Sequence, residues 1–302
     1  MDAQGVVAIS PVFEDAGDFH DNHSPVQLDR RWGLIDMQGE FLFPCEWEFP
    51  TPFVNGYAVI RDKQGSKPER RAYLRLDGTW IVEPKYVLAT PFSCGMAQVF
   101  DGSSYGFINE DGEEAIPLVF KDARDFSEGL APVILDEKWG FIDVFGNSAI
   151  RPQFDAAMPF NEGLARVSVN GNWGFINHAG EFVISPQFAM VWDMHSGLAV
   201  AYTEKKSPKG FIDKTGRFVI EPAYEYVSDF QESLARVTPM NQRLQSFIGL
   251  DGEQAFAREF WSADSFYMQR ALVKTEKTTA YIDPKGVTVW EAPIVDRIVL
   301  PL

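Results

Sequence analysis

The feature that most constrains the fold is a glycine that returns at a nearly constant interval along the chain. A short apolar phrase precedes it, written GNWGFINHAG at residues 171–180 and EKWGFIDVFG at residues 137–146. Successive glycines in this register lie 34 to 39 residues apart; they are Gly39, Gly78, Gly112, Gly146, Gly180, Gly216, Gly252 and Gly286. A fixed period of this length is the signature of a repeat architecture, in which each unit buries its apolar face against its neighbours.

Each repeat contains three short apolar runs, which predict strands. Around Gly180 the runs lie at residues 163–167, 173–176 and 182–184, and polar turns separate them. Short runs rich in β-branched and aromatic residues, bounded by Gly, Asn and Asp, are typical of strands. The turn glycines arrive too often for long helices. We therefore predict an all-β fold of eight three-stranded antiparallel units of about 35 residues each.

The units are expected to form a single domain that spans residues 1–302. Eight units cover residues 25–290, with a partial N-terminal copy at 5–24 and a C-terminal connector at 291–302. Units of this kind close into a propeller-like ring or stack as an open β-solenoid. We favour the ring and keep the solenoid as the alternative. The partial copy is expected either to pair with the last unit or to act as a starting cap.

The polar residues at the recurring turn are assigned to folding. Asp or Asn opens the four-residue turn in six units, at Asp36, Asn109, Asp143, Asn177, Asp213 and Asp283. Such side chains hydrogen-bond the backbone two residues further on, and the closing glycine supplies a positive φ. These carboxylates are therefore expected to shape turns and not to bind metal.

A connector joins each unit to the next, as at residues 152–163. It begins with a proline, Pro152, which is expected to end the preceding strand because proline cannot donate a ladder hydrogen bond. The aromatic residues Phe154 and Phe160 are expected to anchor this connector on the core. Burying such a ring stabilises a fold by roughly 1.5–3 kcal/mol.

No residue pattern points to catalysis or to a cofactor. His20 and His23 form an H-x-x-H pair without a third ligand at a suitable spacing. Cys45 and Cys94 have no neighbouring histidine, and nucleophilic catalysis needs a positioned base. Phosphate-binding and zinc-protease motifs are also missing from the sequence. We therefore expect no enzyme activity, no metal and no cofactor, and an enzyme with an unrecognised site is the third-ranked alternative.

The net charge of the chain limits which classes of partner are expected. Lys and Arg number 27 against 43 Asp and Glu, a net charge of −16. Nucleic acid and anionic membranes need clustered basic residues, so neither is expected as a partner. Two cysteines, no long apolar segment and no basic, apolar leader at the start favour a cytoplasmic protein, with export by a leaderless route left open.

Charges of opposite sign gather in different parts of the repeats. The turns between first and second strands hold 14 of the 27 basic residues, whereas the connectors are rich in acids. Because equivalent positions in a repeat fold lie along one edge, we expect a basic edge and an acidic edge. We predict that the acidic edge binds a basic protein, through Asp125, Glu128, Asp155, Glu162, Asp229 and Glu232. A small-molecule ligand is not expected.

The recurring Trp-Gly-Phe-Ile-Asp/Asn-x-x-Gly phrase, followed by a Pro-x-Phe/Tyr connector, resembles the WG-repeat family of bacterial proteins. The resemblance covers roughly residues 5–300, and Trp-Gly itself occurs at Trp32, Trp139 and Trp173. Elsewhere the phrase drifts, to Tyr105-Gly106, to Lys209-Gly210, and at Ser246 and Ala280. The resemblance implies an all-β, propeller-like repeat fold and implies little about activity.

The sequence thus favours a non-catalytic platform that binds another protein. One concrete form is a bacterial immunity or adaptor protein whose acidic edge covers a basic partner such as a nuclease toxin. A sugar-binding module that uses the Trp side chains as platforms is the alternative. Core packing of these Trp rings is favoured over sugar binding, because the following glycine leaves room for a large ring.

Overall fold

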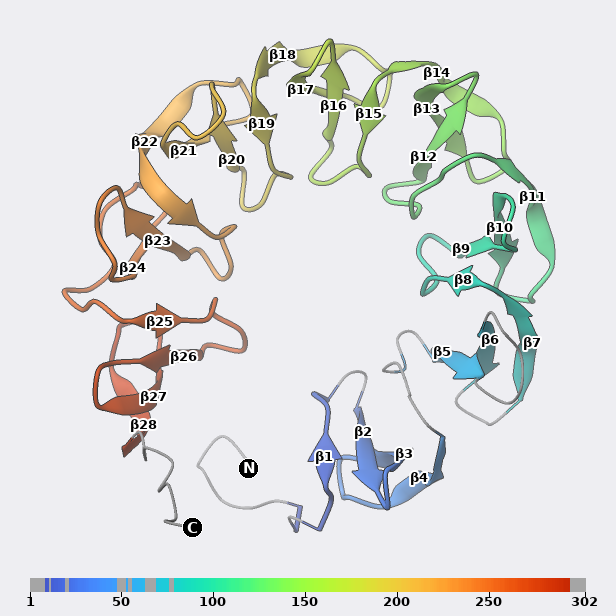
Figure 1. Cartoon of the computed structure of the whole chain (residues 1–302), viewed down its shortest axis with the longest axis horizontal. Coiled ribbons are helices and arrows are strands. Elements are labelled where there is room, and N and C mark those ends of the chain that lie inside the picture. Colours follow the sequence, from blue (N-terminus) through green and yellow to red (C-terminus); the bar gives the residue numbers. More distant parts are fainter. Residues whose placement is uncertain are drawn as a thin grey trace, which may run out of the picture. The chain divides into compact units, whose positions relative to one another are not determined.

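The computed structural model describes residues 9–10, 12–19, 22–47, 53, 56–62, 69–75 and 79–293. Within these residues every helix or strand element is a strand, and the strands form seven antiparallel sheets (Figure 1). The chain divides into two compact units, residues 1–153 and 154–302. No helix in the described part is long and apolar enough to cross a membrane.

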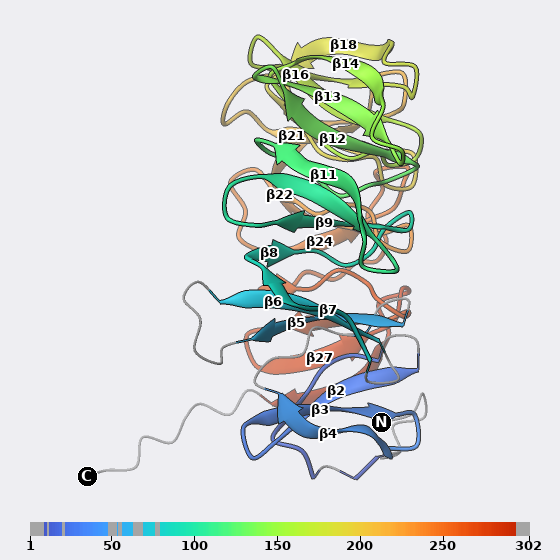
Figure 2. The same cartoon turned by 90° about the vertical axis from the view of Figure 1, so that its right-hand side faces the viewer.

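The first unit contains four sheets, which Figure 2 shows one after another. Their strands are β1 (Asp15–Ala16), β2 (His23–Leu28), β3 (Arg31–Asp36), β4 (Phe41–Trp47); β5 (Tyr57–Asp62), β6 (Arg70–Arg75), β7 (Trp80–Tyr86); β8 (Leu88–Ala89), β9 (Met96–Phe100), β10 (Tyr105–Asn109), β11 (Glu114–Phe120); and β12 (Leu130–Leu135), β13 (Lys138–Asp143), β14 (Ser148–Phe154).

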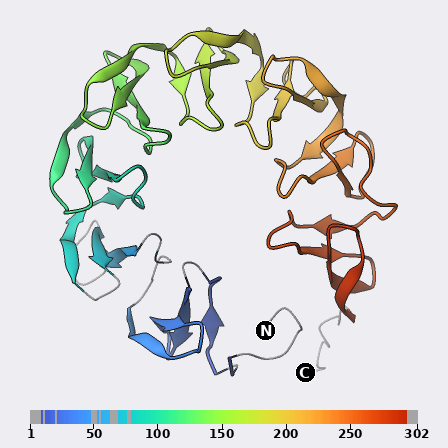
Figure 3. The ribbon, with the colours of Figure 1, turned by 180° about the vertical axis from the view of Figure 1, so that it is seen from behind.

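The second unit contains three sheets, seen from behind in Figure 3. Their strands are β15 (Ala156–Ala157), β16 (Ala165–Val169), β17 (Asn172–Ile176), β18 (Phe182–Phe188); β19 (Met190–Val191), β20 (Ala199–Tyr202), β21 (Lys209–Ile212), β22 (Phe218–Val227), β23 (Ala235–Pro239), β24 (Ser246–Ile248); and β25 (Ser262–Ala263), β26 (Ala271–Lys274), β27 (Thr278–Ile282), β28 (Thr288–Pro293).

The expected three strands per sheet are an undercount, because the connectors contribute a strand of their own. In the sheet β15-β16-β17-β18, the connector residues Ala156 and Ala157 pair antiparallel with Ser168 and Val167. The same short strand appears as β1, β8, β19 and β25. A four-stranded antiparallel sheet is the blade type of β-propellers. Two-residue strands escaped the sequence analysis because they carry no measurable alternation.

The described residues form seven sheets and not the expected eight, because the sixth and seventh repeats share one sheet. Strand β22 runs for ten residues and pairs with β21 and then with β23, which joins both repeats into a six-stranded sheet. The seventh repeat has no regular third strand within the described chain. Isolated bridges, Ile248 to Gln254 and Gln245 to Phe260, take its place.

The turn prediction is confirmed at every described repeat that carries the motif. Gly146 and Gly180 have φ of 81° and 79°. The Oδ1 atom of Asp143 accepts hydrogen bonds from the backbone N–H of Phe145 and of Asn147, both at 2.9 Å. Gly78, His20 and most of the partial copy at 5–13 lie outside the described residues.

The prediction that the connector proline ends the preceding strand is wrong. Strand β18 continues through Pro186 to Phe188, and a bulge absorbs the proline. Trp173 pairs with Phe188 and Phe175 pairs with Ile184. An advance of four residues along β18 therefore lies opposite an advance of two residues along β17. Proline is tolerated at such bulges.

The same bulge explains the glycine of Trp-Gly. A Cβ on Gly174 would lie 2.7 Å from Pro186 N and 2.8 Å from the Ser185 carbonyl carbon. The bulged backbone therefore leaves space only for a hydrogen at this position.

The core lies between successive repeats. In the second unit, Phe175 and Ile184 of the fifth repeat pack with Val191, Ala201 and other residues of the sixth. We call the side of a sheet that packs on the next repeat its trailing face, and the opposite side its leading face. The connector aromatics Phe154 and Phe160 are buried, as predicted.

Candidate protein-binding surface

From the third repeat onward, each connector ends in a tight two-residue turn before the next long strand. In the fifth repeat Asn161 and Leu164 exchange backbone hydrogen bonds of 2.8 and 3.1 Å across Glu162 and Gly163. Both turn residues have positive φ, at 52° and 83°, as a type I′ turn requires. We call the four such turns of the second unit, together with the three connector residues before each turn, the tip row; the turns are Glu162-Gly163, Ser196-Gly197, Glu232-Ser233 and Met268-Gln269.

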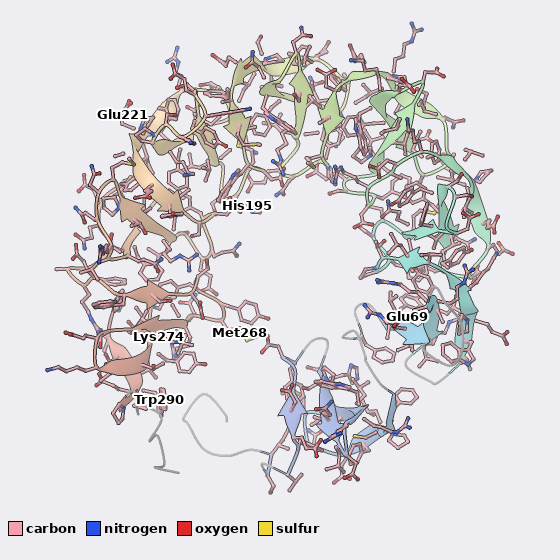
Figure 4. The ribbon with its side chains drawn as sticks, viewed as in Figure 1. Glu69, His195, Glu221, Met268, Lys274 and Trp290 are labelled. Atoms are coloured by element: carbon pink, nitrogen blue, oxygen red, sulfur yellow. The ribbon has the colours of Figure 1, made fainter. Side chains whose placement is uncertain are left out.

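The tips project to a common side of their sheets. Figure 4 shows His195 and Met268 on that side of the second unit and Glu221 on the opposite side. His195 immediately precedes the Ser196-Gly197 tip. The tip row is therefore one surface of the second unit, formed by equivalent turns of consecutive repeats.

Acidic tip residues link one repeat to the next. The carboxylate of Glu162 accepts a hydrogen bond of 2.9 Å from the backbone N–H of Gly197, one repeat further on. The carboxylate of Glu232 accepts from the backbone N–H of Gln269 and from its side-chain Nε2, at 3.0 Å. Charge-assisted bonds of this kind are stronger than neutral ones, so the tips are held in fixed relative positions.

The surroundings of the Glu162 carboxylate also shift its pKa. Burial disfavours its ionised form, but the backbone donors at Gly197 and Ser196 and the Lys214 ammonium outweigh burial and lower its pKa. Lys214 Nζ lies 3.4 Å from Glu162 Oε2. Glu162 is thus ionised at neutral pH and has a cationic partner within the fold.

A second polar link lies beneath the tips. Arg166 on β16 bonds Asp193 Oδ1 through Nε at 2.7 Å and donates to the Val191 carbonyl oxygen through Nη1 at 2.9 Å. Gln98 and Arg236 occupy the equivalent strand position and donate to the equivalent connector carbonyls, at Ala123 and Ala263. These side chains connect consecutive repeats through the connector backbone.

Asp229 differs from Glu162 in its electrostatics. Burial raises its pKa, the positive charges of His195 and Arg166 lower it, and the neighbouring Asp193 raises it, with a net upward shift. His195 Nε2 lies 3.7 Å from Asp229 Oδ2, beyond hydrogen-bond distance. Asp229 is therefore a half-buried carboxylate that lies close to the His195 ring and is influenced by a second carboxylate, Asp193.

Within the second unit, one of the predicted carboxylates, Asp155, lies at a different edge from the others. Asp125 and Glu128 belong to the first unit, where Asp125 accepts a 2.6 Å bond from Thr90 Oγ1. Asp155 accepts a 2.6 Å bond from the backbone N–H of Asn170, in the turn between first and second strands. Because a connector runs across its sheet from one edge to the other, its acids are distributed between both edges. Glu162, Asp229 and Glu232 are brought together along the second unit.

The sequence analysis missed two residues of the tip row. Tyr267 and Met268 are 55% and 69% exposed at the tip of the eighth repeat, where most repeats carry small or acidic residues. Exposed aromatic and methionine side chains are enriched in protein interfaces. The signal was present as a departure from the repeat: Met268 aligns with Glu162 and Glu232.

The Trp residues proposed as sugar platforms are largely covered. Trp139 is buried, and the Arg124 guanidinium lies 4.9 Å from its ring centroid. Trp173 packs on a core cluster, with the Arg166 guanidinium 5.6 Å from its ring. Among the other candidates, His178 stacks on Phe160 and both cysteines are free thiols.

Comparisons with known proteins identify the repeat. The model of the WG containing repeat matches residues 1–31, 32–65, 73–103, 105–139, 139–173, 173–206 and 210–240. A search of curated proteins finds no match.

Among solved structures, one described as the eukaryotic initiation factor is similar over 90% of this chain and 85% of its own, with a TM-score of 0.61 at 9% identity. Two others are less similar. Dihydro-heme d1 dehydrogenase NirN in complex with DHE has a TM-score of 0.47 at 10% identity over 84% of this chain and 67% of its own. Kluyveromyces lactis Hsv2p has a TM-score of 0.45 at 9% identity over 92% and 96%.

The likeness to the initiation factor concerns the fold alone, and together with the four-stranded sheets it confirms the expected all-β, propeller-like fold. The family match covers well over half of the chain. The protein therefore belongs to the family of proteins built from WG-containing repeats.

Proposed function

We propose that the protein is a non-catalytic scaffold that binds another protein through the tip row of its second unit. The observation that carries this proposal is the combination, on one row of fixed turns, of carboxylates with exposed apolar side chains. Glu232 accepts only neutral donors among the described residues, and Met268 at the next tip is 69% exposed. Preorganised turns bind with a smaller loss of conformational entropy than flexible loops.

The partner that fits this row is a protein with a basic surface. Asp229 and Glu232 present negative charge, and Tyr267 and Met268 supply apolar contact area beside it. Complementary charge accelerates encounter, whereas buried aromatic and apolar anchors slow dissociation. A cytoplasmic immunity or adaptor protein that covers a basic toxin is one form of this role. The free thiols of Cys45 and Cys94 are consistent with a reducing compartment.

The experiment is a kinetic comparison of matched variants. A basic partner captured from the native cells by the wild-type protein is purified, and its association and dissociation rates are measured at two salt concentrations. Asp229→Lys is expected to reduce the association rate and its salt dependence, and Met268→Ala to increase the dissociation rate. Glu221→Lys is the control, because it makes the same change from a carboxylate to an ammonium on the opposite side of the same sheets (Figure 4). Equal effects of Asp229→Lys and Glu221→Lys contradict the assignment to the tip row.

Sugar binding remains a second candidate, at a different place from the Trp residues. A cavity of about 490 Å³ lies at the irregular seventh repeat and is lined by polar side chains, including Glu225, Gln242 and Arg243, and by the aromatic Tyr226. Its volume is in the range of small-ligand sites, roughly 300–1,000 Å³. Tyr226 is 63% exposed and offers an aromatic ring among hydrogen-bonding groups, with the Lys209 ammonium 5.7 Å from the ring centroid.

This candidate is tested by titrating the protein with cellotriose, maltotriose and chitotriose in a calorimeter. If the site binds sugar, one of the three gives a measurable heat with wild type and none with Tyr226→Ala. Absence of binding by the wild type, or binding unchanged in Tyr226→Ala, excludes the cavity as a sugar site.

A further inference from the structure

A polar contact between two consecutive repeats of the second unit neutralises one carboxylate of the tip row. Arg166 lies on the trailing face of the fifth repeat and donates through Nε to Asp193 Oδ1, in the connector of the sixth repeat, at 2.7 Å. The same guanidinium donates through Nη1 to the Val191 carbonyl oxygen at 2.9 Å. At this junction the fold therefore balances the charge of Asp193 with an arginine of the preceding repeat.

Asp229 holds the same position in the seventh repeat that Asp193 holds in the sixth. The backbone N–H of Trp192, just before Asp193, donates to the Val200 carbonyl oxygen at 2.9 Å. The backbone N–H of Ser228, just before Asp229, makes the same kind of bond within its own repeat at 2.8 Å. The two carboxylates are therefore equivalent residues of consecutive repeats, and their surroundings can be compared directly.

The arginine that would pair with Asp229 is replaced by a valine. In the fifth repeat the backbone N–H of Met158 donates to the Arg166 carbonyl oxygen, as that of Trp192 donates to Val200 in the sixth. Val200 therefore stands at the position of Arg166, one repeat further along the chain. It is fully buried, and its side chain has no hydrogen-bond donor. The junction between the sixth and seventh repeats thus supplies no guanidinium to Asp229.

A second kind of donor, found in the first unit, is also replaced at this junction. Asp125 is the equivalent carboxylate of the fourth repeat, and Thr90 Oγ1 of the third repeat donates to it at 2.6 Å. The position of Thr90 is taken by Trp192 in the sixth repeat. Within the part of the chain that the structure describes, no group donates a hydrogen bond to the Asp229 carboxylate.

The surroundings of Asp229 favour a cation that comes from outside the fold. Its side chain is 33% exposed, so the carboxylate is accessible at the tip row, and His195 Nε2 lies 3.7 Å from Oδ2. Burial raises the pKa of Asp229, and together with the carboxylate of Asp193 it outweighs the positive charges of His195 and Arg166. A half-buried carboxylate of this kind is stabilised by a cation that donates hydrogen bonds to it.

We propose that Asp229 receives an arginine side chain of the partner protein. The inference rests on the proposed binding role of the tip row and names the group that binds there. The incoming guanidinium does for Asp229 what Arg166 does for Asp193, and its planar fork matches the two oxygens of a carboxylate. A lysine ammonium is a compact point charge without that fork, so it fits less well. Asp229 is thus an anchor for one side chain and not only a steering charge.

The test is a titration of the full 302-residue chain with blocked tripeptides at neutral pH, followed through the NMR signal of the His195 imidazole. The central residue of the peptide is arginine, lysine or citrulline, which has the shape of arginine without its charge. The His195 signal is identified by its loss in His195→Gln. The arginine peptide is expected to shift this signal saturably, the lysine peptide to bind more weakly, and the citrulline peptide not to bind.

Two variants and a control place the binding at Asp229. Asp229→Asn keeps the shape of the side chain without its charge and is expected to raise the dissociation constant of the arginine peptide at least about tenfold. Val200→Arg restores the guanidinium that the fifth repeat supplies and is expected to abolish peptide binding, because it occupies Asp229 from within. Glu221→Gln is the control, because it removes a carboxylate charge on the opposite side of the sheets (Figure 4). If circular dichroism shows that Val200→Arg does not fold, Asp229→Asn decides alone.

Each result either supports or overturns the arginine site. A saturable shift in the wild type and in Glu221→Gln, weakened in Asp229→Asn, supports it. The site is overturned if the wild type shows no saturable shift, if Asp229→Asn binds as well as the wild type, or if the lysine or citrulline peptide binds as tightly as the arginine peptide.

The titration uses no cellular partner, so its outcome is separate from that of the kinetic comparison. If the arginine peptide binds at Asp229 and no basic protein is captured, the arginine site stands and the protein-binding role fails. If a basic protein binds and Asp229→Asn leaves its dissociation rate unchanged, the protein-binding role stands and Asp229 is not the anchor.

Discussion

The fifth repeat, from Leu164 to Phe188, and the eighth, from Arg270 to Pro293, share one strand order, and Phe175 pairs with Ile184 as Tyr281 pairs with Trp290. They differ in what surrounds them. Phe175 and Ile184 are 0% and 2% exposed, whereas Tyr281 and Trp290, at the same positions, are 44% and 47% exposed. The comparison teaches that burial in this fold is decided by the neighbouring repeat and not by the strand pattern of a repeat alone.

The repeats also differ at the glycine of the Trp-Gly phrase. The fifth repeat has Gly174 opposite a bulge that contains Pro186, whereas the eighth has Ala280 paired directly with Glu291. Ala280 is nevertheless 1% exposed. A side chain is accommodated there because β28 runs past it without the bulge. The glycine and the proline are therefore two parts of one backbone feature.

The largest expected effect on stability is at the buried position of the fifth repeat. Phe175→Ala removes a fully buried ring between two repeats and is expected to destabilise the protein by about 3–5 kcal/mol. Tyr281→Ala, at the same position in the eighth repeat, is expected to cost about 1 kcal/mol or less, because Tyr281 is half exposed. The free energies of unfolding are measured by denaturant titration of all variants at one protein concentration. Equal losses at both positions contradict the role assigned to the neighbour.

The next effect concerns the bulge. Gly174→Ala places a Cβ 2.7 Å from Pro186 N, where the contacting atoms are backbone and cannot rotate away. We expect a loss of about 1–3 kcal/mol, as for other overpacked sites. Gly249→Ala is the control, because its Cβ would meet a side-chain oxygen of Asp251 at 3.0 Å and no backbone atom within 4 Å. A stability of Gly174→Ala equal to wild type contradicts the steric explanation of the Trp-Gly phrase.

How far the sequence predicts this fold depends on how local each feature is. The turn from Asp143 to Gly146 was predictable because its hydrogen bonds lie within five residues. The short strand β15 and the bulge at Pro186 were not, because both depend on the register between strands. The same holds for the candidate site. Glu162 was identified from composition, but its bond to Gly197 spans 35 residues and needs the packing of two repeats.

Met268 was missed for the opposite reason. The prediction searched the connectors for what the repeats share, which is acidity, and Met268 is informative because it departs from the shared pattern. The irregular seventh and eighth repeats carry both the exposed tip residues and the cavity at Tyr226. In a repeat protein, the positions that depart from the shared sequence pattern are therefore the first to test for function.

A smaller effect is expected at the turn glycine of the fifth repeat. Gly180 has φ of 79°, a region in which a β-branched residue is strongly disfavoured. Gly180→Val is expected to destabilise the protein by at least about 1 kcal/mol, measured as a lower denaturation midpoint at an unchanged slope. The exposed Val183→Ala, three residues further along, is the control. An unchanged midpoint in Gly180→Val contradicts the turn conformation.

The smallest expected effect is a pH dependence at the tip row. The pKa of Glu162 is lowered in the folded state, so its stabilising contribution is fully present above the ordinary pKa of glutamate, about 4.3. That contribution is lost as the pH falls through the folded pKa. Glu162→Gln removes the charge, retains a hydrogen-bond acceptor for Gly197, and is expected to cost less than about 1 kcal/mol at pH 7.

The difference between wild type and Glu162→Gln is expected to shrink as the pH falls below that value. Asp229 should act with the opposite sign. Its pKa is raised, so the ionised carboxylate weakens the fold at neutral pH, and Asp229→Asn is expected to be as stable as wild type or more stable at pH 7 and to lose that advantage in acid. Denaturation midpoints measured from pH 7 down to pH 3 separate the two residues. Parallel pH profiles for both variants contradict the distinction between Glu162, whose carboxylate is held by backbone donors, and Asp229, whose carboxylate is half-buried near Asp193.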